Sequence, residues 1–383
     1  MVTVGIANSA THAYSDSGIV MFRNQNIKPN FLDDNDIIHI KPEFESGYKN
    51  KRLKKNDLLV ARTGYPGTAC VVPEKYENSQ TFTTLIARPK NSVNPYFLCQ
   101  YLNSDIGVKY FESTQIGGGQ KNSGAGILNE MPVMLPSGIE EESKIAEYFT
   151  NLDHLITLHQ RKCDETKKLK KYMLQKMFPQ NDEKIPEIRF SGFTEAWEQR
   201  KLSDVFQEYS EKNHPELPAL TIIQGGGTVL REESDRNLQY DKSSLSGYKM
   251  VCENDFIVHL RSFEGGLEKS SHKGLISPAY HTFHGDNVDS RFYYSYFRSY
   301  EFIKHKLVPH VYGIRDGRSI DIDGMRTIEI PYTSYEEQKK IGDYIESLDH
   351  LITLHQRKCD ELQKLKKFML QNMFTNIDIP SVF

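Results

Sequence analysis

Leu152–Glu165 reads LDHLITLHQRKCDE, and Leu348–Glu361 reads the same fourteen letters 196 residues further along the chain. The near-identity extends over Leu152–Phe178 and Leu348–Phe374, where only four of 27 positions differ. Self-similarity at this level indicates that the chain contains a duplicated unit.

Both copies of the repeat are expected to form one long helix. Apolar or weakly polar residues recur at alternating spacings of three and four, which is typical of a helix with one buried stripe. Acidic residues precede each copy and lysines gather toward its end, as the helix dipole favours. The residues predicted to pair the helices are Leu152, Leu155, His159 and Leu169 in the first copy and Leu348, Leu351, His355 and Leu365 in the second.

The two helices are expected to pair with each other, because each has the same face to bury. About 38 residues rising 1.5 Å each form a rod of roughly 57 Å, whereas a compact domain of the size that connects them is only about 35 Å across. The connecting chain therefore favours an antiparallel coiled coil, in which the end of the first helix lies beside the start of the second.

Two blocks of lower mutual identity flank the helices, Met1–Pro136 and Pro179–Pro331. Both mix short β-rich runs with turn signals. Asn56–Val60 aligns with Asn254–Val258, and each run is soon followed by an arginine and a glycine turn. The predicted fold class is α+β: two mixed α/β domains separated by two long antiparallel coiled-coil helices in a pseudo-twofold arrangement.

The loops of both blocks are rich in side chains that can read DNA bases. Arginine pairs with guanine through two parallel hydrogen bonds, and asparagine and glutamine pair in the same way with adenine. Any one of these residues alone is better explained as a solvated loop side chain, but their presence in both blocks indicates nucleic-acid binding. The candidate DNA-binding residues are Arg23, Asn24, Gln25, Asn26, Arg62, Thr63, Tyr65, Gln120, Lys121, Gln224, Arg261, Ser262, Arg315 and Arg318.

Composition narrows the class of protein further. The 383 residues carry a net charge of −3, so any basic surface for DNA must be local. The five cysteines form no C-x-x-C pair, which favours free thiols in a reducing cytoplasm. No apolar stretch is long enough for a membrane span, and the N-terminus does not resemble a signal peptide.

Catalytic alternatives find little support in the sequence. Asn94–Phe97 resembles the Asn-Pro-Pro-Tyr/Phe motif of amino-methyltransferases but lacks its second proline, so a helix or strand boundary is expected there. Glu264 and Glu268 near Asp255 suggest a nuclease only weakly. The repeated histidines, five residues apart, point about 140° apart on a helix, so no metal site is predicted. A coiled-coil adapter without DNA specificity is the alternative that stays open.

The repeated LDxLIxLHQRK and LxxLKKxMLQxMF patterns closely resemble the conserved helices of type I restriction–modification specificity subunits. Arg189–Leu202 is similar to the opening of a target-recognition domain in that family. Arg23–Ile27, Arg62–Gly67 and Gly117–Gln120 are similar to further motifs of those domains.

The resemblance implies a DNA specificity subunit that catalyses nothing itself and has no cofactor of its own. Each block would read one half of a bipartite site in double-stranded DNA, and the helices would set the unread spacer and dock two modification (methyltransferase) subunits. Restriction subunits (translocase and nuclease) would complete the assembly, and S-adenosylmethionine, ATP and magnesium would belong to these partners. The implied boundaries are 1–136 for the first target-recognition domain, 137–178 for the central conserved helix, 179–331 for the second domain, 332–376 for the C-terminal conserved helix and 377–383 for a tail. The first domain is expected to lack a counterpart of Ile185–Phe206.

Overall fold

A computed structural model describes residues 1–8, 10–114, 124–136, 138–180, 183–234, 242–259, 261–313 and 319–374. The chain divides into two compact units. Unit 1 comprises Met1–Arg161 with Gln356–Phe383, and unit 2 comprises Lys162–His355. Each unit therefore combines one of the two blocks with part of each long helix. None of the helices in the described part of the chain has the length and apolarity that a bilayer crossing requires.

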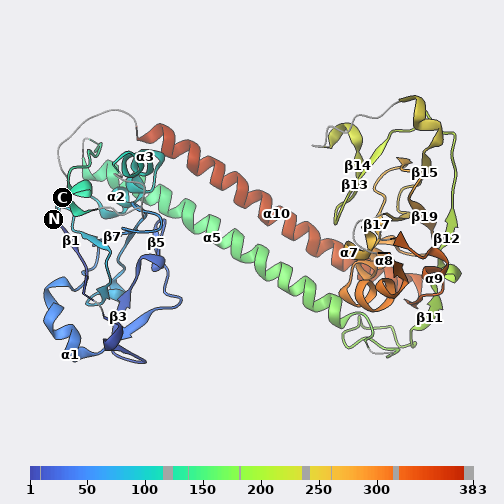
Figure 1. Ribbon diagram of the computed structural model, residues 1–383, viewed down its shortest axis with the longest axis horizontal. Helices are drawn as coiled ribbons and strands as arrows, with labels where there is room; N and C mark the ends of the chain where they lie inside the picture. Colours follow the sequence, from blue (N-terminus) through green and yellow to red (C-terminus); the bar gives the residue numbers. More distant parts are fainter. Residues whose placement is uncertain are drawn as a thin grey trace. The chain divides into compact units, whose positions relative to one another are not determined.

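Unit 1 is built around an antiparallel sheet in the order β1-β10-β7-β8. Strands β1 and β7 of this sheet are labelled in Figure 1. Its strands are β1 (Val2–Val4), β10 (Leu85–Ala87), β7 (Leu58–Val60) and β8 (Ala69–Val71). A second sheet, β2-β6-β3-β9, consists of β2 (Tyr14–Ser15), β6 (Ile38–Ile40), β3 (Ile19–Phe22) and β9 (Gln80–Thr81), and β4 (Ile27–Lys28) pairs with β5 (Phe31–Leu32). The short helices are α1 (Pro42–Glu45), α2 (Pro95–Leu102), α3 (Asp105–Ser113) and α4 (Ala125–Asn129).

Unit 2 has a corresponding sheet in the order β12-β19-β16-β17. Its strands are β12 (Gln207–Tyr209), β19 (His281–His284), β16 (Phe256–Val258) and β17 (Glu268–Lys269). Four strand pairs accompany it: β13 (Leu220–Ile223) with β14 (Gly227–Leu230), β15 (Lys249–Val251) with β18 (Gly274–Ile276), β11 (Glu198–Lys201) with β22 (Glu329–Tyr332), and β20 (Val311–Tyr312) with β21 (Ser319–Ile320). The short helices are α6 (Leu202–Val205), α7 (Ser262–Gly265), α8 (Ser290–Phe297) and α9 (Ile322–Arg326), and a π-helical turn covers Glu301–Leu307.

The two sheets share their register as well as their order. Leu58 pairs with Ala87 in unit 1, and Phe256 pairs with Phe283 in unit 2. The turn before each of these strands contains an asparagine in the left-handed region, Asn56 at φ 69° and Asn254 at φ 71°. Asparagine tolerates this conformation better than most residues, so the predicted alignment of the two runs is confirmed.

The long helices are α5 (Ile139–Lys176) and α10 (Tyr335–Met373). In unit 1, Lys366 Nζ lies 2.5 Å from Asp153 Oδ1. Seven residues after Asp153, Gln160 contacts Cys359, which lies seven residues before Lys366. The two helices are thus antiparallel, and this part of the predicted fold class is confirmed.

Unit 2 repeats the same ion pair between the other two halves of the helices. Lys170 Nζ lies 2.5 Å from Asp349 Oδ1. In the repeat, Lys170 corresponds to Lys366 and Asp349 to Asp153, so one interaction is made twice. The mixed helix and sheet content of both units completes the predicted α+β class.

Four of the predicted pairing residues are wrong. Leu155, Leu169, Leu351 and Leu365 are 40%, 44%, 41% and 41% exposed. At every other position the buried stripe lies one residue later than predicted, and it includes Cys163 and Cys359, which are 2% and 3% exposed. With Cys163 on the stripe, the alternating spacing of three and four residues is unbroken. The predicted stripe would have placed the charged Lys162 at that position. Leu152 and Leu348 are buried, and His159 and His355 are half-buried on the same stripe.

The ends of the long helices enter the cores of the two units. Phe374, just after α10, lies with its ring centroid 5.4 Å from Phe97 and 5.3 Å from Tyr101 in the core of unit 1. The corresponding Phe178, just after α5, packs in unit 2 against Phe292, 4.9 Å away, and Trp197. Each domain therefore encloses the end of one helix and the start of the other.

Candidate nucleic-acid interface

In unit 1, two of the predicted motifs meet at one place. The turn after β3 carries Asn24, and the turn after β7 carries Arg62–Gly67. The backbone N–H of Arg62 donates to Asn24 Oδ1 at 2.8 Å, which joins the two turns. Tyr65, at the tip of the second turn, is 84% exposed. The structure thus brings Arg62, Thr63 and Tyr65 together, whereas the amide of Asn24 joins the turns and also donates to Thr83 Oγ1 at 3.3 Å.

The tight path of this second turn depends on glycine. Gly67 has φ 93°, and a Cβ there would come within 2.3 Å of the Phe111 ring. The backbone therefore lies directly on the helix α3, and Tyr65 projects away from the domain. A projecting aromatic side chain beside an arginine suits stacking or groove contact with nucleic acid.

The turn after β3 also contains residues with a structural role. Asn26 is 2% exposed, and its amide accepts from Arg23 N and donates to the carbonyls of Asp33 and Asn35. Its prediction as a base-reading residue is therefore wrong, because its hydrogen-bonding groups hold the turn. Arg23 and Gln25 both bond the carboxylate of Asp36, at 2.9 and 2.8 Å.

In unit 2, the corresponding surface combines the β13–β14 hairpin with the turn after β16. Gln224 is exposed at the hairpin tip, and Arg261 is exposed at the start of α7. The two segments are in contact, because a Cβ at Gly265 would come within 2.6 Å of Gln224 Nε2. Gln224 and Arg261 therefore lie on neighbouring turns, as Asn24 and Arg62 do in unit 1.

Ser262 does not share this exposure. Its side chain is fully buried, and its Oγ accepts from the backbone N–H of His259 at 2.9 Å. The prediction that it contacts DNA is wrong, since a serine at the start of a short helix is used to close the preceding turn. The predicted residues Gln120, Lys121, Arg315 and Arg318 lie outside the described residues.

A buried glutamate beneath the hairpin was not predicted to have this role. Glu268 is completely buried and accepts hydrogen bonds from the backbone N–H groups of Gly225 and Gly227, at 2.6 and 3.1 Å. Sequence analysis treated Glu268 only as a weak nuclease signal. No local pattern could have revealed this role, because the two glycines lie more than 40 residues away from Glu268 in the chain.

The motif that resembled a methyltransferase signature is a helix boundary, as expected. Asn94 Oδ1 accepts from the N–H groups of Tyr96 and Phe97, at 2.9 and 3.2 Å, and caps α2. Among the described residues, no group of three or more histidine, cysteine or carboxylate side chains is arranged to hold a metal ion.

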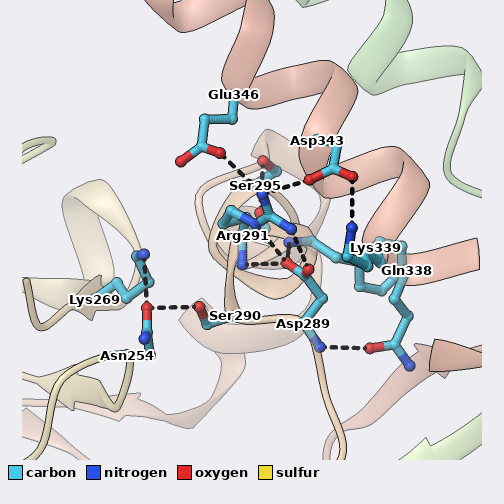
Figure 2. Close-up of polar contacts among 11 residues, drawn as sticks. Asn254, Lys269, Asp289, Ser290, Arg291, Ser295, Gln338, Lys339, Asp343 and Glu346 are labelled. Carbon is cyan, nitrogen blue, oxygen red and sulfur yellow. Dashed lines mark hydrogen bonds and ion pairs between the residues drawn. The ribbon is translucent and has the colours of Figure 1, made fainter. Parts of the chain in front are cut away.

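Each domain is attached to a long helix through the cap of one short helix. In unit 2, Asp289 caps α8 and its own N–H donates to Gln338 Oε1 at 3.0 Å (Figure 2). In unit 1, the N–H of the capping Asn94 donates to Glu142 Oε2 at 2.7 Å. Gln338 and Glu142 are equivalent in the repeat, so the attachment is the same in both units.

Unit 2 adds an ionic cluster to this attachment. Figure 2 shows Arg291 of α8 directed toward α10, where it contacts Asp343 at 2.6 Å and Glu346 at 2.9 Å. These carboxylates, together with Asp289, raise the pKa of the Arg291 guanidinium above its ordinary value. Lys339 of α10 joins the cluster through Asp343. Helix α8 of unit 2 is thus anchored to α10 by charge as well as by the backbone.

Comparison with known proteins shows which proteins this chain resembles. Residues 8–168 match the type I restriction modification DNA specificity domain. The type I restriction enzyme MjaVIII specificity subunit of Methanocaldococcus jannaschii is 23% identical over 342 residues, covering 84% of this chain and 79% of that protein. The chain therefore resembles type I specificity subunits over most of its length. The putative MjaX specificity subunit of the same organism is 23% identical over 305 residues, covering 76% and 70% of the two chains.

One solved structure shares the fold of this chain. The S subunit of a type I restriction-modification system from M. genitalium has a TM-score of 0.59 at 12% identity, and the match covers 98% of this chain and 94% of that one. The HsdS subunit from Thermoanaerobacter tengcongensis has a TM-score of 0.43 at 14% identity, covering 97% and 94%. The matched model describes a DNA specificity domain, and the two curated relatives are named as specificity subunits. The comparisons give no support to an adapter without DNA specificity.

Proposed function

We propose that unit 1 and unit 2 each read one half of a bipartite target in double-stranded DNA and leave the bases between the halves unread. The observation that carries this proposal is the equivalent pair of turns described above. The strand ends present Arg62 and Tyr65 in unit 1 but Gln224 and Arg261 in unit 2. Because base choice depends on side chains and not on the scaffold beneath them, two such surfaces suit two different half-sites.

The long helices have a second apolar stripe that supports docking of two modification subunits. In unit 1 it consists of Leu155, Leu158, Leu365 and Phe368, and in unit 2 of Leu169, Tyr172, Leu351 and Leu354, all between 37% and 60% exposed. This stripe lies beside the buried seam, and antiparallel pairing brings these flanking positions of the two helices to the same side of the pair. Regular exposed apolar surface of this kind marks a protein interface. Its repetition supports one modification subunit on each unit, with restriction subunits joining the complex.

S-adenosylmethionine, ATP and magnesium are proposed to be bound by these partner subunits and not by this chain. The specificity subunit then contributes only the choice of site. Its expected behaviour alone is weak, salt-dependent binding to DNA, and selective binding is expected only with the modification subunits.

The half-site assignment is tested by methylome sequencing of cells that express this chain with its modification subunits. Replacing residues 1–136 with the corresponding block of another specificity subunit is expected to change one half of the methylated motif and leave the other unchanged. Inserting whole helical turns at equivalent points of α5 and α10 is expected to change the spacer alone. Methylation of all duplexes alike, or a change of both halves after the exchange, contradicts the proposal.

Single substitutions distinguish base contacts from phosphate contacts. Arg62→Ala or Arg261→Ala is expected to cost about 1–3 kcal/mol of binding and to relax one position of the motif if the arginine contacts a base. An equal loss on every duplex assigns the arginine to phosphate instead.

The docking surface is tested by the stoichiometry of the complex. Leu155→Glu combined with Leu365→Glu is expected to remove one of two modification subunits, as measured by native mass spectrometry. Thr157→Glu is a matched control, because Thr157 is exposed on α5 outside both apolar stripes. Retention of both subunits by the double variant contradicts docking at this stripe.

A further inference from the structure

Glu268 lies at the centre of a buried network beneath the recognition hairpin of unit 2. In addition to the two glycine N–H groups, its carboxylate accepts from the Tyr294 hydroxyl at 2.8 Å and from Arg298 Nη1 at 2.9 Å. A fully buried carboxylate is costly unless it is paired and hydrogen-bonded. This one has four donors, two of them backbone groups of a single turn, so both its charge and its position are fixed.

The hairpin tip is shaped to lie on this network. Gly225 has φ 84° and Gly227 has φ 73°, both in the left-handed region. A Cβ at Gly225 would come within 2.9 Å of Arg298 Nη2, so the turn rests directly on the guanidinium. Gln224 immediately precedes Gly225, whose N–H is held by Glu268, and the direction of the Gln224 side chain therefore depends on that hydrogen bond.

The same glutamate connects the hairpin to the neighbouring turn. Glu268 begins β17, only a few residues after Arg261 and directly beyond Gly266 and Leu267. Gly266 has φ 84°, and a Cβ there would come within 2.1 Å of the Phe297 carbonyl of α8. The Arg261 turn, the hairpin tip and α8 are thus joined within a few residues of one carboxylate.

We propose that Glu268, held by Tyr294 and Arg298, is the positioning residue that sets the half-site specificity of unit 2. It does not contact DNA itself. It fixes the hairpin tip so that Gln224 is presented beside Arg261 in one orientation. This inference rests on the proposed function, because it assigns to Glu268 the fidelity of one of the two reading surfaces.

Unit 1 uses different chemistry at the same place and therefore provides an internal control. By strand register, Cys70 occupies the position of Glu268. Counted from the helix caps, Asn103 occupies the position of Arg298, and its amide donates to Asn30 Oδ1 and to the Ala69 carbonyl, both at 2.8 Å. A neutral amide network holds this region of unit 1, so loss of the Glu268 charge is expected to leave unit 1 unaffected.

The experiment uses the complex of this chain with its modification subunits and measures methylation of duplexes with single-base changes in either half-site. Glu268→Gln is expected to lower discrimination in the half read by unit 2 at least tenfold while discrimination in the other half stays unchanged. Glu264→Gln is the matched control, since Glu264 is exposed in the same segment. Continued reading of the other half shows that the variant complex is folded.

A second variant tests the same contact from the hairpin side. Gly225→Ala places a methyl group against Arg298 and is expected to relax the same half-site, whereas Gly247→Ala is expected to have no effect because a Cβ there meets no atom within 4 Å. An equal fall in methylation of all sites, with discrimination retained in both halves, overturns the positioning role of Glu268 but leaves the proposed function standing. Absence of any sequence preference in the unmodified complex overturns the proposed function and this inference with it.

Discussion

The sheets of unit 1 and unit 2 have the same order and register but different side chains at one end of their two central strands. In unit 1, Arg88 Nε donates to buried Asp57 at 3.0 Å. In unit 2, the equivalent Asp255 is bonded by His284 Nδ1 at 2.6 Å and by the Tyr209 hydroxyl. The backbone register and the buried aspartate are common to both units at this end of the strands. The side chain that bonds the aspartate can change, provided that the carboxylate stays hydrogen-bonded. Only unit 2 acquires a partner that titrates near neutral pH.

A second difference lies at the start of the long helices. Glu337 of unit 2 is completely buried, where it bonds Arg189 at 2.7 Å and Trp197 Nε1 at 3.0 Å. Its equivalent in the repeat, Glu141 of unit 1, is exposed. The same residue type at the same position of the repeat is therefore a core ion pair in one unit and a surface side chain in the other.

The largest expected effect breaks this second comparison. Glu337→Ala leaves Arg189 and the indole N–H buried without their acceptor and is expected to destabilise unit 2 by about 4 kcal/mol. Glu141→Ala is expected to change stability by less than about 0.5 kcal/mol. Trp197 is the single tryptophan of the chain and belongs to unit 2, so its fluorescence during denaturation follows that unit. Equal effects of the two substitutions would show that the equivalence is misassigned.

The next effect sharpens the assignment of each helix end to a unit. Phe178→Ala and Phe374→Ala each remove a buried ring and are expected to cost roughly 3 kcal/mol. Phe178→Ala is expected to shift the unfolding transition seen by Trp197 fluorescence. Phe374→Ala is expected to shift the transition seen by far-ultraviolet circular dichroism more than the fluorescence transition. The reverse result would place the end of α10 outside the core of unit 1.

A pH-dependent difference between the units is expected from the exchanged partner of the buried aspartate. The hydrogen bond to Asp255 raises the pKa of His284. The resulting stabilisation is complete below the unfolded pKa of about 6.5 and is lost as the pH rises through the higher folded value. The free energy of unfolding followed by Trp197 fluorescence is therefore expected to fall between pH 6 and pH 8.5 more in the unmodified chain than in His284→Gln.

This difference measurement is needed because other histidines of unit 2 also titrate. Carboxylates raise the pKa of His214, whereas burial lowers the pKa of His259. His214 and His259 are both present in the His284→Gln variant, so their contributions cancel when the two proteins are compared. In unit 1, Arg88→Gln is expected to lower stability by the same amount at both pH values, and a pH-dependent loss there would contradict the contrast between the units.

The smallest effect tests the feature that the units share. Lys170→Met and Lys366→Met each remove one copy of the repeated ion pair, and each is expected to cost about 0.2–1 kcal/mol. Lys366 is expected to lie at the upper end, because its side chain and that of Asp153 are 14% and 31% exposed, against 26% and 52% for Lys170 and Asp349. Double-mutant cycles with the two aspartates measure both coupling energies, and coupling only at Lys170 would contradict this order.

The repeat allowed the long helices, their antiparallel pairing and the two-domain α+β fold to be predicted from the sequence. At every other position the buried stripe was assigned one residue too early. The reason is that Leu155 and Leu169 are apolar as members of the second, exposed stripe. Periodicity finds apolar faces, but it does not tell which face pairs within the chain.

For the candidate recognition surface, the sequence indicated which types of residue to expect but not which individual residues are exposed. Arg62 and Gln224 lie on turns as expected, but Asn26 and Ser262 are buried, since a letter does not reveal whether a polar group faces solvent or closes its own turn. Glu268 was beyond sequence reasoning because its hydrogen-bond partners come from two distant segments, the β13–β14 hairpin and α8 with its C-terminal cap, brought together only by the tertiary fold.

The repeated ion pair bears on the history of the chain. Each copy of the repeat carries one aspartate and one lysine, and each of these finds its partner on the other copy. An ancestor with a single copy would have carried both the aspartate and the lysine on one helix. Two such chains paired antiparallel in a symmetric dimer would have made the ion pair twice. Gene fusion of a self-associating homodimer would then have freed its two surfaces to diverge.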